Sequence, residues 1–579
     1  MIQNNYFSDN QDIQDHFVHI LPWTEIILDY ENDFSGVAEG GPSNPSEAKE
    51  YYKTVLDTVG DLAGNILSPH VADLDREGLK FKDGKVEFPP KMLELVSKVV
   101  EAGVQAYGFS RKYGGLGIPW TVKSFISEIF YRVDASLAIA IGCVNLAEIL
   151  ERHATEEMKN DWIPRLADGK FVCAMGLTEP DHGSDLSNLR TKATKDKEGN
   201  WILNGTKRFI THGCGFGDLP AVLLTLARSG EINSGARGLS FFLVQSTDVQ
   251  IAGIENKLGL HCSPTCEVVF ENSPGLLIGE EGYGLIKYTM GMLNGARMGI
   301  AQQSTGLATA AYYEALKYAK ERIQFGRPLI EIPAIKKILD RIERETYAMR
   351  CLTLEGSRVM DHYYWRAIRL EKQGATEKEI KNDTVVRYWE KIANVLTPIS
   401  KYYCSESCLK AVNDALQIHG GAGYTEDYDI SRIYRDARIV TIYDGTSQIQ
   451  VNACIGGITS GLTHTFGEYV SELISRSDSS LTHKLFNGFQ ELVKLYKELP
   501  EREMKDTYAE EIVLTCSRLL AGVLFEFSCK RLPEDKKLLR LKHVKDYHID
   551  TLSVLEGNLS KLKEVTKLRF YNCTICLEN

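Results

Sequence analysis

Cysteine is scarce in this sequence, with thirteen in 579 residues, and this excludes a fold held together by a dense disulfide framework. The N-terminus, MIQNNYFSDNQDIQDHF, lacks the basic segment and apolar core of a secretory signal. We therefore expect a cytoplasmic protein with free thiols. Cys573 and Cys576 form a single CxxC pair. Because that is only half of a zinc site, we expect no metal.

Long apolar runs are also lacking. A membrane span needs roughly 20 mostly apolar residues, and the nearest candidate, residues 512–527, is interrupted by Arg518 and Glu526. We expect a buried amphipathic helix there and no stretch that spans a bilayer. The basic run at 536–545 is explained by a solvated helix face, so we expect no membrane contact.

Neither an excess of basic residues nor a nicotinamide-binding motif is present. The 67 Lys and Arg are outnumbered by 78 Asp and Glu, for a net charge of −11, which argues against nucleic acid as a partner. No glycine-rich GxGxxG turn follows a strand in a β-α alternation, which excludes a Rossmann nicotinamide domain.

The pattern of apolar residues predicts a mainly helical protein with a central β domain. Apolar residues recur at helical spacing in the first and last parts of the chain. Between them lie short β-rich runs such as WILNGTKRFIT and LSFFLVQ, and the spacing of these runs suits antiparallel strands in a small barrel or sandwich. Asn44 is placed to cap the helix that follows it, and Pro500 and Pro533 to break C-terminal helices. The predicted segments are an N-terminal extension (1–45), a helical domain (46–170), a β domain (171–285), a helical domain (286–460) and additional C-terminal helices (461–579).

Two clusters in the β region carry features that suggest chemistry. In MGLTEPDHGSD, Thr178 offers a hydroxyl, Ser184 a donor for an anion, and Gly183 close backbone approach. In NGTKRFITHG, Phe209 and Thr211 share one strand face by the period-two rule, which suits stacking on and hydrogen bonding to a flat heteroaromatic cofactor. Taken singly, a polar loop and a half-buried strand explain these clusters equally well.

Two further clusters lie in the second helical region. YAKERIQFGRPL places Arg322 at a helix end, where a guanidinium is able to bind phosphate. QIHGGAG lets a backbone lie against a nucleotide, and the later IYDGTSQIQ places a carboxylate, Asp444, on a turn after an apolar run. A solvated helix end and ordinary glycine turns are the alternative explanations.

Together the four clusters resemble the acyl-CoA dehydrogenase family, in order and in separation. LTEPxxGSD, GxKxxITxG, RxQFGxPL, QxxGGxG and IYxGTSQIQ are all present, and residues 257–265 resemble the family's KLGxxxSPT segment. The resemblance covers roughly residues 50–460. It implies a helical N-terminal domain, a β middle domain, a helical bundle, an FAD cofactor, an acyl-CoA substrate, an electron-transfer flavoprotein as acceptor, and at least a homodimer or homotetramer.

The resemblance also implies roles for particular residues. Thr211 would face flavin N5, and Phe209 replaces the Trp of many members, which keeps stacking but loses an indole donor. Arg322 and Gln324 would reach the FAD of a neighbouring subunit. The full set of implied cofactor residues is Leu177, Thr178, Gly183, Ser184, Phe209, Thr211, Arg322, Gln324, Gln417, Gly420, Gly421, Thr446 and Gln448. The implied substrate residues are Ser184, Ser263, Arg297, Tyr443 and Gly445.

The base position departs from the family pattern, because Asp444 stands where most members have Glu. A carboxylate there would take the α-proton of the thioester while hydride leaves the β-carbon. Some branches place the base immediately before the equivalent of Arg297, but here that residue is Ala296. Asp444 is therefore the predicted catalytic residue.

Because Asp444 is shorter than Glu, the sequence does not identify the acyl group of the substrate. Alicyclic (cyclohexane- or cyclohexene-carbonyl-CoA type) dehydrogenases and nitroalkane oxidases of the wider superfamily resemble this pattern, and an ordinary fatty acyl-CoA enzyme with a tolerated substitution is equally compatible. An oxygen-using flavin oxidase and a non-catalytic flavoprotein are the remaining alternatives. The intact SPT and SQIQ segments favour a CoA thioester.

Overall fold

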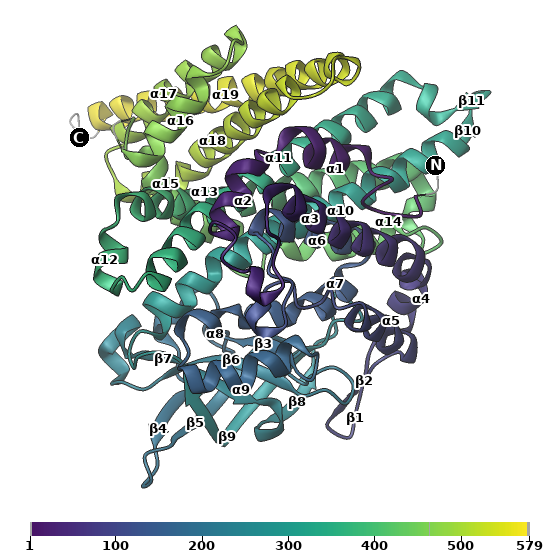
Figure 1. Ribbon diagram of the computed structural model, residues 1–579. Helices are drawn as coiled ribbons and strands as arrows, with labels where there is room; N and C mark the ends of the chain where they lie inside the picture. Colours follow the sequence, from purple (N-terminus) through teal and green to yellow (C-terminus); the bar gives the residue numbers. More distant parts are fainter. Residues whose placement is uncertain (1–2, 463, 576–579) are drawn as a thin grey trace. The chain divides into compact units, whose positions relative to one another are not determined.

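The computed structural model describes residues 3–462 and 464–575 (Figure 1). The chain forms two compact units. The first comprises Met1–Asn10, Trp23–Gly299 and Tyr424–Ile439, and the second comprises Gln11–Pro22, Ile300–Gly423 and Val440–Asn579. The predicted order of helices, strands, helices and additional C-terminal helices is confirmed. The five predicted segment boundaries stay a prediction.

The strands of the first unit form a β-barrel. The closed path runs β6–β4–β5–β9–β7 and back to β6, with β3 paired to β6 and β8 paired to β9. All seven residues of β7 are buried or half-buried, which fits its run LSFFLVQ. The bounds are β3 Val172–Gly176, β4 Lys192–Lys195, β5 Trp201–Thr211, β6 Ala221–Arg228, β7 Leu239–Gln245, β8 Gln250–Ile254 and β9 Thr265–Leu277.

The barrel is not wholly antiparallel, contrary to the expectation from sequence. Strand β6 pairs in parallel with both β3 and β4. The 44 residues between β3 and β6 provide the long connection that a parallel pair needs, whereas a tight hairpin would enforce the antiparallel arrangement. Two short hairpins outside the barrel, β1–β2 (Lys80–Lys82, Lys85–Glu87) and β10–β11 (Ile323–Gln324, Arg327–Pro328), were not expected.

Helices make up the rest of the first unit. The Asn44 side chain accepts a hydrogen bond from the Glu47 N–H at 3.0 Å, so it is the predicted N-cap. Helix α6 is buried along almost its whole length, as its apolar sequence suggests. The helices are α2 Trp23–Glu31, α3 Pro45–Asp61, α4 Val71–Glu77, α5 Pro90–Glu101, α6 Trp120–Val133, α7 Ala135–Gly142, α8 Glu148–His153, α9 Glu156–Ala167 and α14 Ile430–Ala437.

The second unit is helical. Helix α10 (Met290–Glu321) continues into it from the first unit, and short hydrogen-bonding side chains tie α10 to its neighbours: Thr305 contacts Thr353 of α11 at 3.4 Å, and Ser304 contacts Ser405 of α13 at 3.5 Å. Helix α15 packs along α13. The helices are α1 Gln11–Asp15, α11 Pro333–Lys372, α12 Glu377–Asn382, α13 Thr384–His419, α15 Ser447–Thr459, α16 Thr465–Ser475, α17 Ser480–Glu498, α18 Arg502–Lys530 and α19 Glu534–Ile575.

The additional C-terminal helices pack onto the bundle of the second unit. Helix α18 lies against α11 and α15, and α17 and α19 lie against α18 (Figure 1). The Phe525 ring stacks on Tyr347 of α11 with centroids 4.5 Å apart. The predicted breaks at Pro500 and Pro533 are confirmed, because α17 ends at Glu498 and α18 ends at Lys530.

By length and composition alone, α18 could cross a membrane, which corrects the expectation that no stretch could do so. However, 83% of its most apolar window is buried inside the protein. Its Arg518 guanidinium pairs with Glu345 of α11 at 3.0 Å. This agrees with the expectation of a buried helix, because one face packs on α11 while the charged groups are paired within the core.

The N-terminal segment Gln11–Pro22 belongs to the second unit and meets the C-terminal helices there. The Lys536 ammonium pairs with Asp15 at 2.6 Å, and the Arg540 guanidinium pairs with Asp12. The Arg540 guanidinium also contacts Glu343 of α11 at 3.0 Å. These contacts join the start of the chain to α19.

Candidate functional site

The first two motifs come together in the first unit. The loop that follows β3 runs beside β5, where the Arg208 N–H donates to the Thr178 carbonyl at 2.9 Å. One residue earlier on β5, the Lys207 ammonium donates to the Leu177 carbonyl at 2.9 Å. Thr178 and the exposed Phe209 are therefore held on neighbouring segments, as the sequence predicted for one cofactor surface.

A buried ion pair fixes this arrangement, and sequence analysis missed it. The fully buried Lys207 ammonium lies 2.9 Å from Glu179, which also accepts the N–H groups of Arg190 and Thr191 at 2.7 and 2.8 Å. Burial opposes ionisation of Glu179, but Lys207 and the backbone donors hold its pKa below the ordinary value. Both residues belong to sequence motifs, Glu179 to LTEP and Lys207 to GxK. Neither motif by itself indicates that the two side chains form an ion pair.

The exposed face of this region suits a flat ring. Phe209 is 53% exposed, while the next residue, Ile210, is buried. Phe209 has φ of +61° at a β-bulge, since the register with β9 shifts between Lys207 and Ile210. Thr211 is half-buried, and the predicted shared face of ring and hydroxyl stays a prediction, because the bulge interrupts the period-two alternation.

Gly183 adds open space to that face. A Cβ placed there would meet only the Thr178 methyl, at 3.7 Å. No described protein atom therefore requires glycine at this position, which fits a surface kept open for a ligand. Ser184, beside it, is exposed. An exposed ring, two hydroxyls and open space beside them fit the isoalloxazine and phosphates of FAD.

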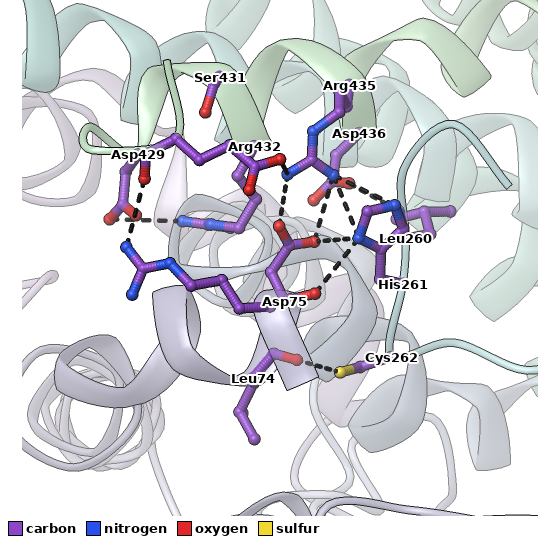
Figure 2. A network of polar contacts seen from close by, with 12 residues as sticks. Leu74, Asp75, Leu260, His261, Cys262, Asp429, Ser431, Arg432, Arg435 and Asp436 are labelled. Carbon is purple, nitrogen blue, oxygen red and sulfur yellow. Dashed lines mark hydrogen bonds and ion pairs between the residues drawn. The ribbon is translucent and has the colours of Figure 1, made fainter. Parts of the chain in front are cut away.

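The segment of residues 257–265 is anchored to helices α4 and α14 (Figure 2). The Leu260 N–H donates to the Asp436 carboxylate at 2.7 Å, and the Cys262 thiol donates to the Leu74 carbonyl at 2.9 Å. The predicted substrate residue Ser263 is buried in this turn, and its carbonyl accepts a hydrogen bond from Lys257 at 2.7 Å. A substrate contact of the Ser263 side chain stays a prediction.

Charged residues complete the same cluster. Arg432 pairs with Asp134 at 2.7 Å. Asp75 binds both Arg435 and His261, at 2.5 and 3.1 Å (Figure 2). Burial, assisted by the negative charge of Asp134, raises the pKa of Asp436 to about 7. Sequence analysis did not identify this cluster, because its members come from four separate segments.

The predicted base lies in the second unit, in the turn between residues 441 and 447. Asp444 has φ of +52°, its side chain is half-buried, and burial raises the pKa of its carboxyl. The Lys401 ammonium, on α13, donates to the carbonyls of Tyr443 and Gly445. The Tyr443 hydroxyl contacts the Gln303 side chain. A carboxylate with a raised proton affinity, held on a fixed turn, is able to act as a general base.

The other predicted cofactor residues of the second unit lie at exposed turns. Arg322 and Gln324 are exposed on the β10–β11 hairpin, and Arg322 makes no side-chain hydrogen bond or ion pair within residues 3–462 and 464–575. A Cβ at Gly420 or Gly421 would meet nothing within 4 Å. Gln417 and Gln448 are exposed as well. A free guanidinium and open glycine backbone suit an anionic nucleotide.

Two predicted residues already have structural partners. The Thr446 hydroxyl caps α15 by accepting the Ile449 N–H at 3.4 Å. Arg297 is buried on α10 and donates to Asn294 at 2.9 Å. Among the described residues, no group of three or more acidic, His or Cys side chains could hold a metal. Cys576, from the CxxC pair, lies outside the described residues.

Three family models match consecutive parts of the chain. They are described as acyl-CoA dehydrogenase N-terminal, middle and C-terminal domains, and they match residues 49–170, 174–273 and 284–457. The "Acyl-CoA dehydrogenase, short-chain specific" of Megasphaera elsdenii is 31% identical over 408 residues, covering 69% of this chain and 95% of that protein.

Solved structures share the fold. A chain from "Electron transferring flavoprotein of Acidaminococcus fermentans" is 28% identical, with a TM-score of 0.59 over 71% of this chain and 98% of that chain. An acyl-CoA dehydrogenase complexed with FAD from Bacillus anthracis is 23% identical, with a TM-score of 0.72 over 88% of both chains. That coverage exceeds the share of residues 1–460, so the shared fold extends into the additional helices. The chain belongs to the acyl-CoA dehydrogenase family of FAD-dependent oxidoreductases.

Proposed function

We propose that this protein oxidises an acyl-CoA thioester to its enoyl-CoA, with Asp444 as the catalytic base. The observation that carries the proposal is the position of Asp444: a half-buried carboxylate with a raised pKa, on a fixed turn, at the family's base position. Bound FAD supplies the acceptor for the hydride that leaves the β-carbon. Asp444 takes the α-proton as the carbon–carbon double bond forms.

The remaining residues of the proposed site bind and orient. The Phe209 ring would stack on the flavin and the Thr211 hydroxyl would hydrogen-bond to it, while Thr178 and Ser184 add donors beside them. The free Arg322 guanidinium would neutralise phosphate. Family membership implies these roles, and the exposure of the side chains supports them.

The short base leaves two classes of acyl group to be considered. Asp is one methylene shorter than Glu, and a misplacement of about 1 Å can cost roughly 100-fold in rate. The substrate must therefore approach the base more closely or present a different carbon. We propose a CoA thioester of either a bulky alicyclic acid or a linear fatty acid, and the two are separated by experiment.

Replacement of the base tests the proposal. Asp444→Asn preserves shape and removes basicity, so FAD and acyl-CoA should still bind while anaerobic flavin bleaching by the substrate slows at least 1,000-fold, within the range of general-base effects. Flavin reduction by Asp444→Asn at the parental rate would disprove the assignment. A panel of linear and alicyclic acyl-CoAs identifies the preferred parent substrate.

The conservative change Asp444→Glu separates the two substrate classes. If Asp is matched to a bulky ring, the longer side chain crowds the site and lowers the rate on alicyclic thioesters. If Asp is a tolerated replacement, Glu maintains or raises the rate on linear thioesters. Binding of FAD, measured from the absorbance of the purified variant, is the control for folding.

We further propose a cytoplasmic homodimer or homotetramer that passes electrons to an electron-transfer flavoprotein. The similarity to a chain from the structure of the electron transferring flavoprotein of Acidaminococcus fermentans and the exposed β10–β11 hairpin support these partners. Rapid reoxidation of the reduced enzyme by oxygen, in the absence of an electron-transfer flavoprotein, would instead indicate an oxidase.

A further inference from the structure

The turn that carries Asp444 requires outside support. It lies between the short helix η13 (Arg438–Thr441) and α15, with no regular structure of its own. Asp444 adopts a left-handed backbone (φ +52°), a conformation that is unfavourable for a non-glycine residue. The direction of its carboxylate depends on this backbone, because residues on a left-handed turn project differently from those on an extended one. Whatever holds the turn also aims the base.

Lys401 provides that support from α13. Its side chain is almost completely buried (1% exposed), and its ammonium donates to the carbonyls on both sides of Asp444, those of Tyr443 and Gly445. Burying an ammonium is costly unless its donors are satisfied. A solvated lysine would avoid this cost, so its burial against two carbonyls indicates a specific arrangement.

A second, uncharged side chain, that of Gln450, also supports the turn that carries Asp444. The Gln450 amide, one turn into α15, donates to the Gly445 carbonyl at 2.8 Å and to the Asp444 carbonyl at 3.3 Å. The carbonyls of three successive residues are therefore all engaged. Lys401 differs from Gln450 in carrying a positive charge beside the base.

We propose that Lys401 is a positioning residue for catalysis: its buried ammonium holds the backbone around Asp444 so that the carboxylate faces the substrate, and its charge favours the ionised base. This inference rests on the proposed role of Asp444. Gln303 of α10, which is neutral, contacts the Tyr443 hydroxyl, and Glu406 of α13 accepts a hydrogen bond from Ser447.

The charge has a measurable consequence. Burial raises the pKa of Asp444, and Lys401 opposes that effect. Removal of the ammonium should therefore raise the pKa further. The base is active when ionised, so the acidic limb of the rate–pH profile should move to higher pH.

Three variants separate positioning from charge. In anaerobic stopped-flow measurements of flavin reduction, Lys401→Met should lower the rate at pH 7 by about 10- to 100-fold and move the acidic limb to higher pH. Lys401→Arg keeps the positive charge, so the acidic limb of its rate–pH profile should stay near that of the parent. Gln450→Met removes the hydrogen bonds to the Gly445 and Asp444 carbonyls but no charge, so it should lower the rate without moving the acidic limb of the rate–pH profile.

Two outcomes would overturn the inference. One is a parental rate and limb in Lys401→Met; the other is an equal limb shift in Gln450→Met, which would indicate only general loosening. If Lys401→Met does not fold, Lys401→Gln carries the same expectations. The base assignment is tested separately: if Asp444→Asn is active, the proposed function fails, whereas an inactive Asp444→Asn with a normal Lys401→Met rejects Lys401 alone.

Discussion

Gly259 shows how single residues determine the anchoring of the 257–265 segment. A Cβ at this position would lie 2.6 Å from the backbone carbon of Arg435 and 2.7 Å from the Asp436 carboxylate. Real Cβ atoms do not approach other atoms so closely, and the backbone of α14 cannot rotate away. Only glycine therefore allows the segment to pack directly on α14.

Gly259→Ala should accordingly destabilise the protein by about 1–3 kcal/mol, the usual cost of overpacking. Urea unfolding followed by circular dichroism measures the change. Gly253→Ala on β8 is the matched control, because a Cβ there would meet nothing within 4 Å. Equal stability of the two variants would show that the segment does not pack on α14 as described.

The sequence motifs identified the predicted base, but they did not predict its backbone conformation or the side chains that contact its turn. Asp444 follows from the IYxGTSQIQ pattern. Its left-handed backbone and its partner Lys401 do not, because Lys401 lies 43 positions earlier on α13 and only folding brings the two together. For the same reason, the pairing of Glu179 with Lys207 was not apparent from LTEP and GxK.

At the scale of elements, α14 concentrates charge that other elements must balance. Arg432 pairs with Asp134, and the Asp436 carboxylate accepts the Leu260 N–H. Arg435 pairs with Asp75 (Figure 2). Because Asp436 is buried and close to another carboxylate, the folded chain holds a proton on it that the unfolded chain releases at lower pH. Asp436 thus links the stability of this cluster to pH.

The sign of the pH dependence follows from that proton. The pKa of Asp436 is raised from 3.8 to about 7 in the folded chain, so its stabilising contribution is complete below pH 3.8 and is lost as the pH rises through about 7. Asp436→Asn keeps an oxygen acceptor for the Leu260 N–H but cannot ionise. Between pH 5.5 and 8.5, the variant should gain about 2 kcal/mol in unfolding free energy relative to the parent.

Urea unfolding at both pH values measures this difference. The control is Asp73→Asn on α4, since the Asp73 side chain is 83% exposed and its charge needs no burial. A constant difference between Asp436→Asn and the parent across the pH range would mean that Asp436 is ionised in the folded protein.

Elements with a strong apolar pattern were predictable, and short polar ones were not. The runs WILNGTKRFIT and LSFFLVQ coincide with β5 and β7 residue for residue. Strands β4 (KATK) and β8 (QIAGI) have mostly exposed or half-buried residues, so they lack the alternation that identifies a strand. Parallel pairing of β6 was not predictable, because it depends on connections outside the strands themselves.

At the scale of the whole molecule, the exposed β10–β11 hairpin is the segment that the proposed oligomer would cover. Phe325 at its tip is 92% exposed, and Arg322 and Gln324 beside it are exposed too. Ile323 on β10 is 60% exposed as well, so the hairpin presents two neighbouring apolar side chains that a partner subunit would cover. The composition alone predicted a globular protein, but a subunit contact was implied only by the family resemblance.

Arg322→Ala should weaken FAD retention by about 1.5–3 kcal/mol if its guanidinium binds FAD phosphate. Dialysis followed by flavin absorbance measures the retained FAD, and analytical ultracentrifugation measures the oligomeric state. Arg327→Ala, on the opposite strand of the same hairpin, is the control and should retain FAD. A monomeric parent with full FAD content would contradict the cross-subunit role.

The contacts between Gln11–Pro22 and α19 impose an order on biosynthesis. Asp12 and Asp15 find their basic partners 528 and 521 residues later in the chain. At roughly 5–20 residues per second, a ribosome needs on the order of 25–100 seconds to reach those partners. During that interval Asp12 and Asp15 lack their α19 partners, although Arg350 of α11 is also close to Asp12, at 3.7 Å. The ion pairs that join Gln11–Pro22 to α19 can therefore form only after nearly the whole of this sequence has been synthesised.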